Sequence, residues 1–449
     1  MLAATSPLRN RDFRRLWIAG LISDTGDWML LVTLPVLVYQ LTGSTSGTSI
    51  AFLVELAPAV LIAPVAGKLA DRVDRRKMLI VVSLIQAAAL SPLLAGTHLV
   101  LVYLVIAAQA GLAAAFDPAK NALLPTLVER DQLVPANSLT GLNENLGRLL
   151  GGSLGGLLLA TGHLGFVAVA DAASFLLAAL FIAGVRTPAP VVPAPEAAAD
   201  RARVSARRPV RAGLAVVALT AVAQGLFIVL FVIFVARSLH GGAAENGLLR
   251  AVQAIGAIGG GLLLARARRI SPGRLTAPAC LVFGALALLT WNLPGLTTFE
   301  PVYVALFVAV GAPAIAMTSG LISTLQHATA DGERGRVFAA FGLASTAGQA
   351  LGIVAAGILG DRLGVVLLLN VQAALYLAGG LVALGWLTDH SRPQPRRRRP
   401  GGRPAGPRKP GRVSRPEVIG SGIARRMRGM IAEPKRPAIE VHVSRPPWS

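Results

Sequence analysis

The chain has 449 residues, of which 54% are hydrophobic and 14% are charged, and its formal net charge is +21. A typical soluble domain has about 25% charged residues, so this composition excludes a protein whose whole surface faces water. It indicates an integral membrane protein. The single cysteine, Cys280, also excludes an intrachain disulfide and a cysteine-based metal site.

Twelve apolar stretches are long enough to cross a bilayer, whose hydrocarbon core of about 30 Å requires about 20 apolar residues per helix. We therefore predict an all-α integral membrane protein. The segment before the first stretch has no A-x-A cleavage site after a short apolar core, so we expect the first helix to be retained. The predicted spans are residues 13–39, 48–69, 78–96, 99–117, 137–160, 164–185, 212–236, 246–265, 275–292, 301–325, 338–360 and 364–387.

Basic residues predict the orientation, because Lys and Arg collect in cytoplasmic loops. Of the 43 basic residues, 39 lie at the N-terminus, in loops that follow even-numbered spans, in the central linker or in the C-terminal tail. The loops 40–47 and 95–100, predicted outside, carry no formal charge. We therefore expect a multi-pass protein of the bacterial inner or plasma membrane, with both termini in the cytoplasm.

The loop between the second and third spans reads GKLADRVDRRK over residues 67–77. It resembles the signature loop between helices 2 and 3 of the major facilitator superfamily, with Asp74 in place of the usual Gly. The resemblance implies a major facilitator fold of two six-helix bundles, alternating access and a loop that braces the outward-facing state, where a helix-ending carboxylate faces a positive helix N-terminus. The matched gating-loop residues are Gly67, Asp71, Arg72, Arg75, Arg76 and Lys77.

An internal repeat supports a parallel duplication of six helices. GKLADRVDR at 67–75 is echoed at 261–269, and GLNENLGRLLG at 141–151 is echoed at 342–352. We predict an N-terminal bundle over 1–186, a cytoplasmic linker over 187–211, a C-terminal bundle over 212–387 and a tail over 388–449.

Three further stretches narrow the branch. Residues 22–44, 121–139 and 171–180 resemble the drug:proton antiporters of the enterobactin-exporter-like and macrolide-efflux-like groups. The Gly-rich segment 147–156 resembles the antiporter motif of the fifth helix without its Gly-Pro pair. Small residues let helices approach closely, so tight packing and a gating hinge remain equal alternatives for this segment.

Charged residues inside predicted spans are functional candidates, because each costs at least about 2.5 kcal/mol near the bilayer centre. Asp24 and Asp27 are three residues apart and share a helix face, and with Glu55 they are the candidates for proton coupling; a structural role is the alternative for each. Glu144 and Arg148 have the i, i+4 spacing of an intramembrane ion pair. Asp171 is expected to be structural.

The tail over residues 388–449 is rich in Arg, Pro and Gly, a composition that cannot bury enough surface to fold. Attraction to anionic lipid at the inner leaflet is one interpretation, since each basic residue near that surface contributes about 1 kcal/mol. An uncommitted tail is the other. We do not expect nucleic-acid binding.

No P-loop sequence occurs, and we expect no enzyme activity, cofactor or metal site. The sequence therefore predicts a monomeric secondary active transporter that exports a hydrophobic or amphipathic small molecule, of drug, macrolide or siderophore type, in exchange for protons. The alternatives are an importer or uniporter of the same fold, and a non-transporting membrane scaffold or sensor that uses the basic tail.

Overall fold

The computed structural model describes residues 7–129, 132–186, 208–266, 273–329 and 333–387. Most of the predicted linker and all of the predicted tail lie outside these ranges. Within residues 63–72 only the backbone is described, as the end of a helix. The predictions for the side chains of Gly67, Asp71 and Arg72 therefore lie outside the described part of the chain.

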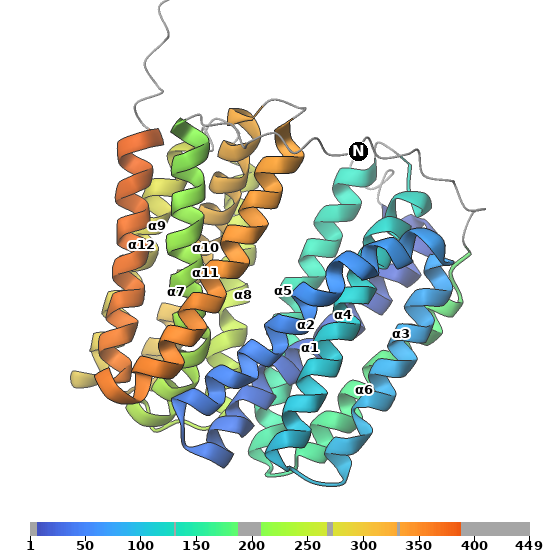
Figure 1. The fold of residues 1–449 in the computed structure, drawn as a ribbon, viewed down its shortest axis with the longest axis horizontal. Helices are drawn as coiled ribbons and strands as arrows, with labels where there is room; N and C mark the ends of the chain where they lie inside the picture. The colour runs from blue at the N-terminus through green and yellow to red at the C-terminus, as the bar shows by residue number, and fades with distance from the viewer. Residues whose placement is uncertain (1–6, 130–131, 187–207, 267–272, 330–332, 388–449) are drawn as a thin grey trace, which may run out of the picture. The chain divides into compact units, whose positions relative to one another are not determined.

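The described chain contains twelve α-helices. Figure 1 shows how they are arranged in space. Short 3-10 turns, η1 (Pro7–Arg9), η2 (Ser91–Leu94) and η4 (Leu293–Gly295), lie beside three of them. The first six helices are α1 (Arg11–Thr42), α2 (Thr45–Arg72), α3 (Arg75–Ala89), α4 (Leu99–Leu127), α5 (Leu133–Ala160) and α6 (Leu164–Ala183). The second six are α7 (Arg208–Ser238), α8 (Ala243–Arg266), α9 (Gly273–Asn292), α10 (Glu300–Ala328), α11 (Arg334–Leu363) and α12 (Val365–Leu387).

Local sequence explains where α1 begins and ends. The Asn10 side chain accepts hydrogen bonds from the backbone N–H groups of Asp12 and Phe13, which satisfies two donors that a helix start leaves free. At the other end, Gly43 has φ 61° and donates its N–H to the Tyr39 carbonyl. A residue without Cβ adopts this left-handed conformation without strain, so α1 stops and the chain turns into α2.

The two halves pack by the same scheme. In the first half α1 packs on α5 and α6, α2 on α4, and α3 on α4 and α6. In the second half α7 packs on α11 and α12, α8 on α10, and α9 on α10 and α12. Each pairing of the first half recurs six helices later. The expected fold of two six-helix bundles is confirmed, and the repeated pairing agrees with a duplicated ancestor.

Eleven of the described helices are long and apolar enough to cross a membrane. The exception is α5, whose middle carries Asn143, Glu144, Asn145 and Arg148. It is nevertheless as long as its neighbours and packs on α1 within the bundle. Asn143 donates to the Trp17 carbonyl of α1 and Arg148 lines an internal pocket, so a membrane-spanning helix need not be apolar all round.

The two halves meet through glycines. Gly152 and Gly156 of α5 lie against Gly247 of α8, so that a methyl group on Gly247 would come within 2.9 Å of the Gly156 Cα and would collide with the Gly152 carbonyl oxygen. On the other side of the interface, Gly357 of α11 lies against Ser49 of α2. Small side chains allow this close approach of helix backbones.

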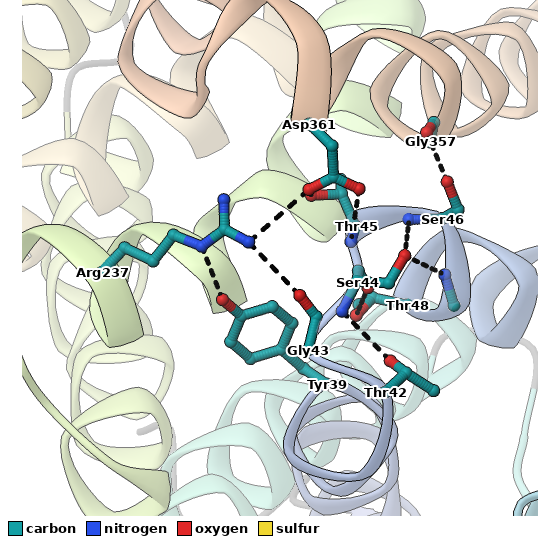
Figure 2. Close-up of polar contacts among 11 residues, drawn as sticks. Tyr39, Thr42, Gly43, Ser44, Thr45, Ser46, Thr48, Arg237, Gly357 and Asp361 are labelled. Carbon is teal, nitrogen blue, oxygen red and sulfur yellow. Dashed lines mark hydrogen bonds and ion pairs between the residues drawn. The ribbon is translucent and has the colours of Figure 1, made fainter.

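Polar contacts complete the interface near the α1–α2 connection (Figure 2). The Arg237 guanidinium, at the end of α7, donates to the Tyr39 hydroxyl at 2.8 Å and lies 3.5 Å from the Asp361 carboxylate of α11. Asp361 accepts hydrogen bonds from the backbone N–H and the hydroxyl of Thr45 at 3.2 and 2.8 Å. Ser46 donates to the Gly357 carbonyl at 2.8 Å. We call these contacts the interbundle latch.

Candidate functional site

A central cavity of about 390 Å³ lies between the two halves. Trp28 of α1 and Glu55 of α2 line it from the first half, and Gln224 of α7 and Arg250 of α8 line it from the second. Most of the remaining lining is apolar. Ligand pockets typically measure about 300–1,000 Å³ and place a few polar groups in an apolar wall. The cavity has the size and lining of a site for a small organic molecule.

A pocket of about 230 Å³ lies inside the first half, between α1, α2 and α4. We call it the acidic pocket, because Asp27 and Glu55 both line it. Glu55 also faces the central cavity, so one carboxylate belongs to both spaces. Among the described residues, no basic group lies within ion-pair distance of either carboxylate. The structure thus brings together two candidates that the sequence indicated separately.

A third space of about 160 Å³ extends into the second half. Its charged lining residues are Arg148 of α5 and Arg250 of α8, and aromatic rings including Trp28, Phe227 and Trp291 complete it. We call it the arginine pocket. Trp28 lines all three spaces, so the acidic pocket, the central cavity and the arginine pocket are neighbours around one indole ring.

Asp24 has a different environment from Asp27. The Lys120 ammonium of α4 lies 3.9 Å from the Asp24 carboxylate and 3.4 Å from that of Asp117, and 5.7 Å from the centre of the Phe116 ring. Asp24 is therefore neutralised by a partner on a neighbouring helix. This ion pair favours the structural alternative for Asp24, and its role in proton coupling stays a prediction.

Sequence reasoning missed Lys120. The fourth span was predicted to end at residue 117, which placed Lys120 in a cytoplasmic loop, but α4 continues to Leu127 through Pro118 and Pro125. The i, i+3 spacing of Asp117 and Lys120 was the available signal for a helical pair. The predicted end of the fourth span was wrong because the apolar stretch ends at the first charged residues, whereas helix α4 continues past them.

Asp171 is fully buried on α6, where one of its carboxylate oxygens accepts a hydrogen bond from the Ser174 hydroxyl at 3.1 Å. Its other oxygen has no hydrogen-bond partner among the described residues. Gly26 lies directly against the Asp171 carboxylate and the Ser174 hydroxyl, so any side chain at position 26 would collide with them. This contact places α6 against α1 beside Asp27.

Arg148 turns away from its expected partner. Its guanidinium donates to the Asn145 side chain at 2.9 Å and lies 5.7 Å from the centre of the Trp28 ring. Within the described contacts, Glu144 is not an ion-pair partner of Arg148, and that pair stays a prediction. Arg148 instead becomes part of the arginine pocket.

The described part of the signature loop ties helix ends together. Asp74 caps α3 by accepting from the backbone N–H groups of Arg76 and Lys77. Arg75 donates to the Ala122 carbonyl of α4 at 3.0 Å, and Arg76 donates to the carbonyls of Ile182 and Ala183. A cation at the C-terminus of a helix complements the helix dipole. The loop's role in gating stays a prediction.

In the part of the chain that the structure describes, no group of three or more His, Cys, Asp or Glu side chains could hold a metal ion. Among the described residues, the ionisable side chains that line these three spaces are the carboxylates Asp27, Glu55 and Asp117 and the guanidinium groups Arg148 and Arg250. The site can therefore bind protons and charged or polar groups of a ligand.

Twelve helices in two repeated bundles, around a largely apolar central cavity with a few charged and polar groups, define a membrane transporter. A model of the transmembrane secretion effector family of the major facilitator superfamily matches residues 2–390, and the chain belongs to this family. It contains transporters, not enzymes.

Two relatives match over most of their length. The MFS-type transporter YfiS of Bacillus subtilis (strain 168) is 28% identical over 386 residues, which cover 81% of this chain and 90% of that one. The enterobactin exporter EntS of Citrobacter koseri is 27% identical, covering 84% and 90%. Among solved structures, a bacterial homologue of the iron transporter ferroportin in its inward-facing state has a TM-score of 0.68 at 16% identity, covering 84% of this chain and 99% of that one. This last likeness concerns the fold.

Proposed function

We propose that the protein is a proton-coupled exporter of an amphipathic small molecule. The observation that carries this proposal is the position of Glu55, which faces both the acidic pocket and the central cavity and has no ion-pair partner among the described residues. A carboxylate inside a membrane protein marks a proton or substrate pathway by default. The relationship to an enterobactin exporter supports export as the direction.

The places where the halves touch support a mechanism of alternating access. The glycine contacts between α5 and α8 and the interbundle latch join the halves near the α1–α2, α7–α8 and α11–α12 connections. With both termini in the cytoplasm, as the basic residues predict, these connections face outside. The structure then corresponds to an inward-facing state, closed to the outside by the latch.

The cycle has four steps. Substrate enters the central cavity from the cytoplasmic side while Asp27 and Glu55 are ionised. The latch opens and the opposite end closes, which exposes the cavity outside. Protons bind to the carboxylates and displace the substrate. Inward reorientation and proton loss to the cytoplasm restore the first state.

Reconstitution into liposomes with an imposed pH gradient tests this function, with substrate and proton movement followed together over a panel of lipophilic cations, macrolides and siderophores. We expect uptake or release that depends on the gradient in the native protein and is lost in Asp27→Asn/Glu55→Gln. Glu300→Gln, which changes an exposed carboxylate at the start of α10, is the matched control and should transport normally. Gradient-driven flux that survives the double substitution would overturn the roles of both carboxylates.

Flux without proton movement would instead indicate a uniporter. The scaffold alternative differs from both, because it requires the basic tail and no flux.

We propose that the transporting unit is a monomer, since the cavity is formed by the two halves of one chain.

A further inference from the structure

Arg250 is the least expected charge in the described helices. It lies in α8 with only 8% of its surface exposed, and its guanidinium carbon is 5.2 and 5.6 Å from the ring centres of Phe227 and Phe231. Among the described residues, no carboxylate lies within 4.0 Å of it and no hydrogen-bond acceptor is matched to it. Glu55 lines the same cavity and interacts with Arg250 electrostatically, but without ion-pair contact. A buried cation without a contacting acceptor is an exception to the rule that buried charges are paired.

Aromatic contacts do not compensate for this burial. A cation–π contact stabilises a cation by less than the solvation free energy that the cation loses when it is taken out of water. A purely structural arginine would have a protein acceptor. Arg250 lines the arginine pocket and the central cavity, so its free donors point to the space that a ligand can enter.

Arg148 adds a second cation from the other half. Its Nε is buried and has no hydrogen-bond partner among the described residues. Both arginines line the same pocket, whose wall includes no Asp or Glu side chain. The aromatic side chains of Trp28, Phe227 and Trp291 line it, and Gln224 and Gln253 supply further polar groups. Charge and shape there favour a planar anionic group, because guanidinium binds carboxylates in a bidentate way.

The acidic pocket, which neighbours the arginine pocket, has the opposite charge. Asp27 and Glu55 line the acidic pocket, and Trp28 borders both pockets. A ligand that spans the two would place an anion beside Arg250 and a cation beside Glu55. Protons would compete with the cationic end of such a ligand for the carboxylates of Asp27 and Glu55. Exchange of substrate for protons requires this competition.

We propose that the substrate is an aromatic zwitterion, whose acidic group binds Arg250 and Arg148 and whose basic group binds the Asp27/Glu55 pair. This proposal rests on the proposed function for the direction of transport, but not for binding. It differs from the general expectation of a lipophilic drug because it excludes substrates that carry positive charge alone.

Three probes with the same dansyl ring test the proposal: dansyl-lysine, which is a zwitterion, dansylcadaverine, which is a cation, and dansyl-aminohexanoate, which is an anion. Trp28 and Trp291 line the arginine pocket, so energy transfer from tryptophan to the dansyl ring reports binding to the purified full-length protein. We expect dansyl-lysine to bind at least about 10-fold more tightly than either singly charged probe, as expected for one additional charged hydrogen bond.

Substitutions of Arg250 and Glu55 show which residue binds the acidic group of the probe and which binds its basic group. Arg250→Gln should weaken dansyl-lysine and dansyl-aminohexanoate about 10- to 100-fold and leave dansylcadaverine unchanged, and Arg250→Lys should restore part of the loss. Glu55→Gln should weaken the two amine-bearing probes only. Arg362→Gln, at an exposed position of α11, is the control for loss of a positive charge.

The outcomes separate the two proposals. Equal binding of the cation and the zwitterion to the native protein, or no binding of any anionic probe, would overturn the zwitterion proposal even if a pH gradient drives export of cationic drugs. Charge-selective binding without gradient-driven flux would support the zwitterion site and contradict proton-coupled export. If Arg250→Gln fails to fold, the relative affinities of the three probes for the native protein still test the zwitterion proposal.

Discussion

At the scale of single residues, the charges inside the first bundle divide into two kinds. Asp24 is matched by Lys120, whereas Asp27 and Glu55 face a pocket without a basic partner among the described residues. The matched pair stabilises the bundle, and the unmatched carboxylates are available to protons and ligands. Removing one charge of the Asp24–Lys120 pair should therefore lower the stability of the protein, whereas removing the charge of Asp27 or Glu55 should affect binding and transport.

We expect Lys120→Met to destabilise the protein by about 3 kcal/mol, because it leaves Asp24 buried without its cation. The free energy of unfolding can be measured by SDS titration in mixed micelles. Adding Asp24→Asn to Lys120→Met should recover most of the loss. Asp117→Asn should have a small effect, since 62% of that side chain is exposed. A double variant as unstable as Lys120→Met alone would show that Lys120 acts through packing.

Sequence could identify individual intramembrane charges but not their partners. Asp27 and Glu55 were predicted as separate candidates because each stands in an apolar stretch. The packing of α1 against α2 places both residues around one pocket. The spacing of residues along a single helix cannot predict this arrangement. Arg250 stood near the predicted outer end of a span, a position where an arginine ordinarily reaches the membrane surface. Its burial against Phe227 became visible only with α7 in place.

At the scale of helices, the contact of α5 with α8 depends on the absence of side chains. Gly247→Ala should destabilise the state in which these helices touch by about 1 to 3 kcal/mol, because the added methyl collides with the α5 backbone. Gly259→Ala in the same helix is the matched control, since a methyl there meets nothing within 4 Å.

The shift in conformation can be measured by thiol labelling. Ser49 is buried against Gly357 in the interface, and Cys280, the one native cysteine, is buried as well. In a Ser49→Cys, Cys280→Ala background, Gly247→Ala should accelerate labelling, and Gly259→Ala should not. Equal labelling rates in the two variants would contradict an interface that opens during the cycle.

The interbundle latch makes a separate prediction. Asp361→Ala removes the acceptor for Thr45 and the ion-pair partner of Arg237, which should weaken the closed state by about 1 to 2 kcal/mol. Labelling of Ser49→Cys should then be about 5- to 30-fold faster. Arg362→Ala, one residue further along α11, is the control and should leave the rate unchanged. A labelling rate unaffected by Asp361→Ala would show that the glycine contacts alone close this end.

Sequence predicted the helices better than their ends. The apolar stretches identified all twelve, because each helix must cover about 30 Å of hydrocarbon. The third span was predicted as continuous over 78–96, but α3 ends at Ala89 and η2 follows at Ser91, where Pro92 interrupts the helix. The latch was not predicted, since Arg237 and Asp361 lie at helix ends where charged residues are ordinarily solvated.

At the scale of the whole molecule, the twelve helices that repeat one packing scheme all precede the basic tail in the sequence. A chain truncated after residue 390 should keep its gradient-driven flux, because the described residues that line the cavities precede that point. Flux in liposomes with and without anionic lipid measures this. Binding to anionic vesicles should fall in the truncated protein if the tail's 16 basic residues attract lipid. Loss of flux on truncation in neutral liposomes would favour a tail-based function.

The interbundle latch also has a consequence for where such a cell can live. The Arg237 and Asp361 side chains are 46% and 40% exposed. If this end of the molecule faces outside, as the basic residues predict, both side chains meet the surrounding medium. Ions screen exposed charge pairs, and the Debye length falls from about 10 Å at 0.1 M salt to about 3 Å at 1 M. Under the proposed cycle, outward opening would be easier at high salt than at low salt, so we expect the rate of export to rise with the salinity of the medium.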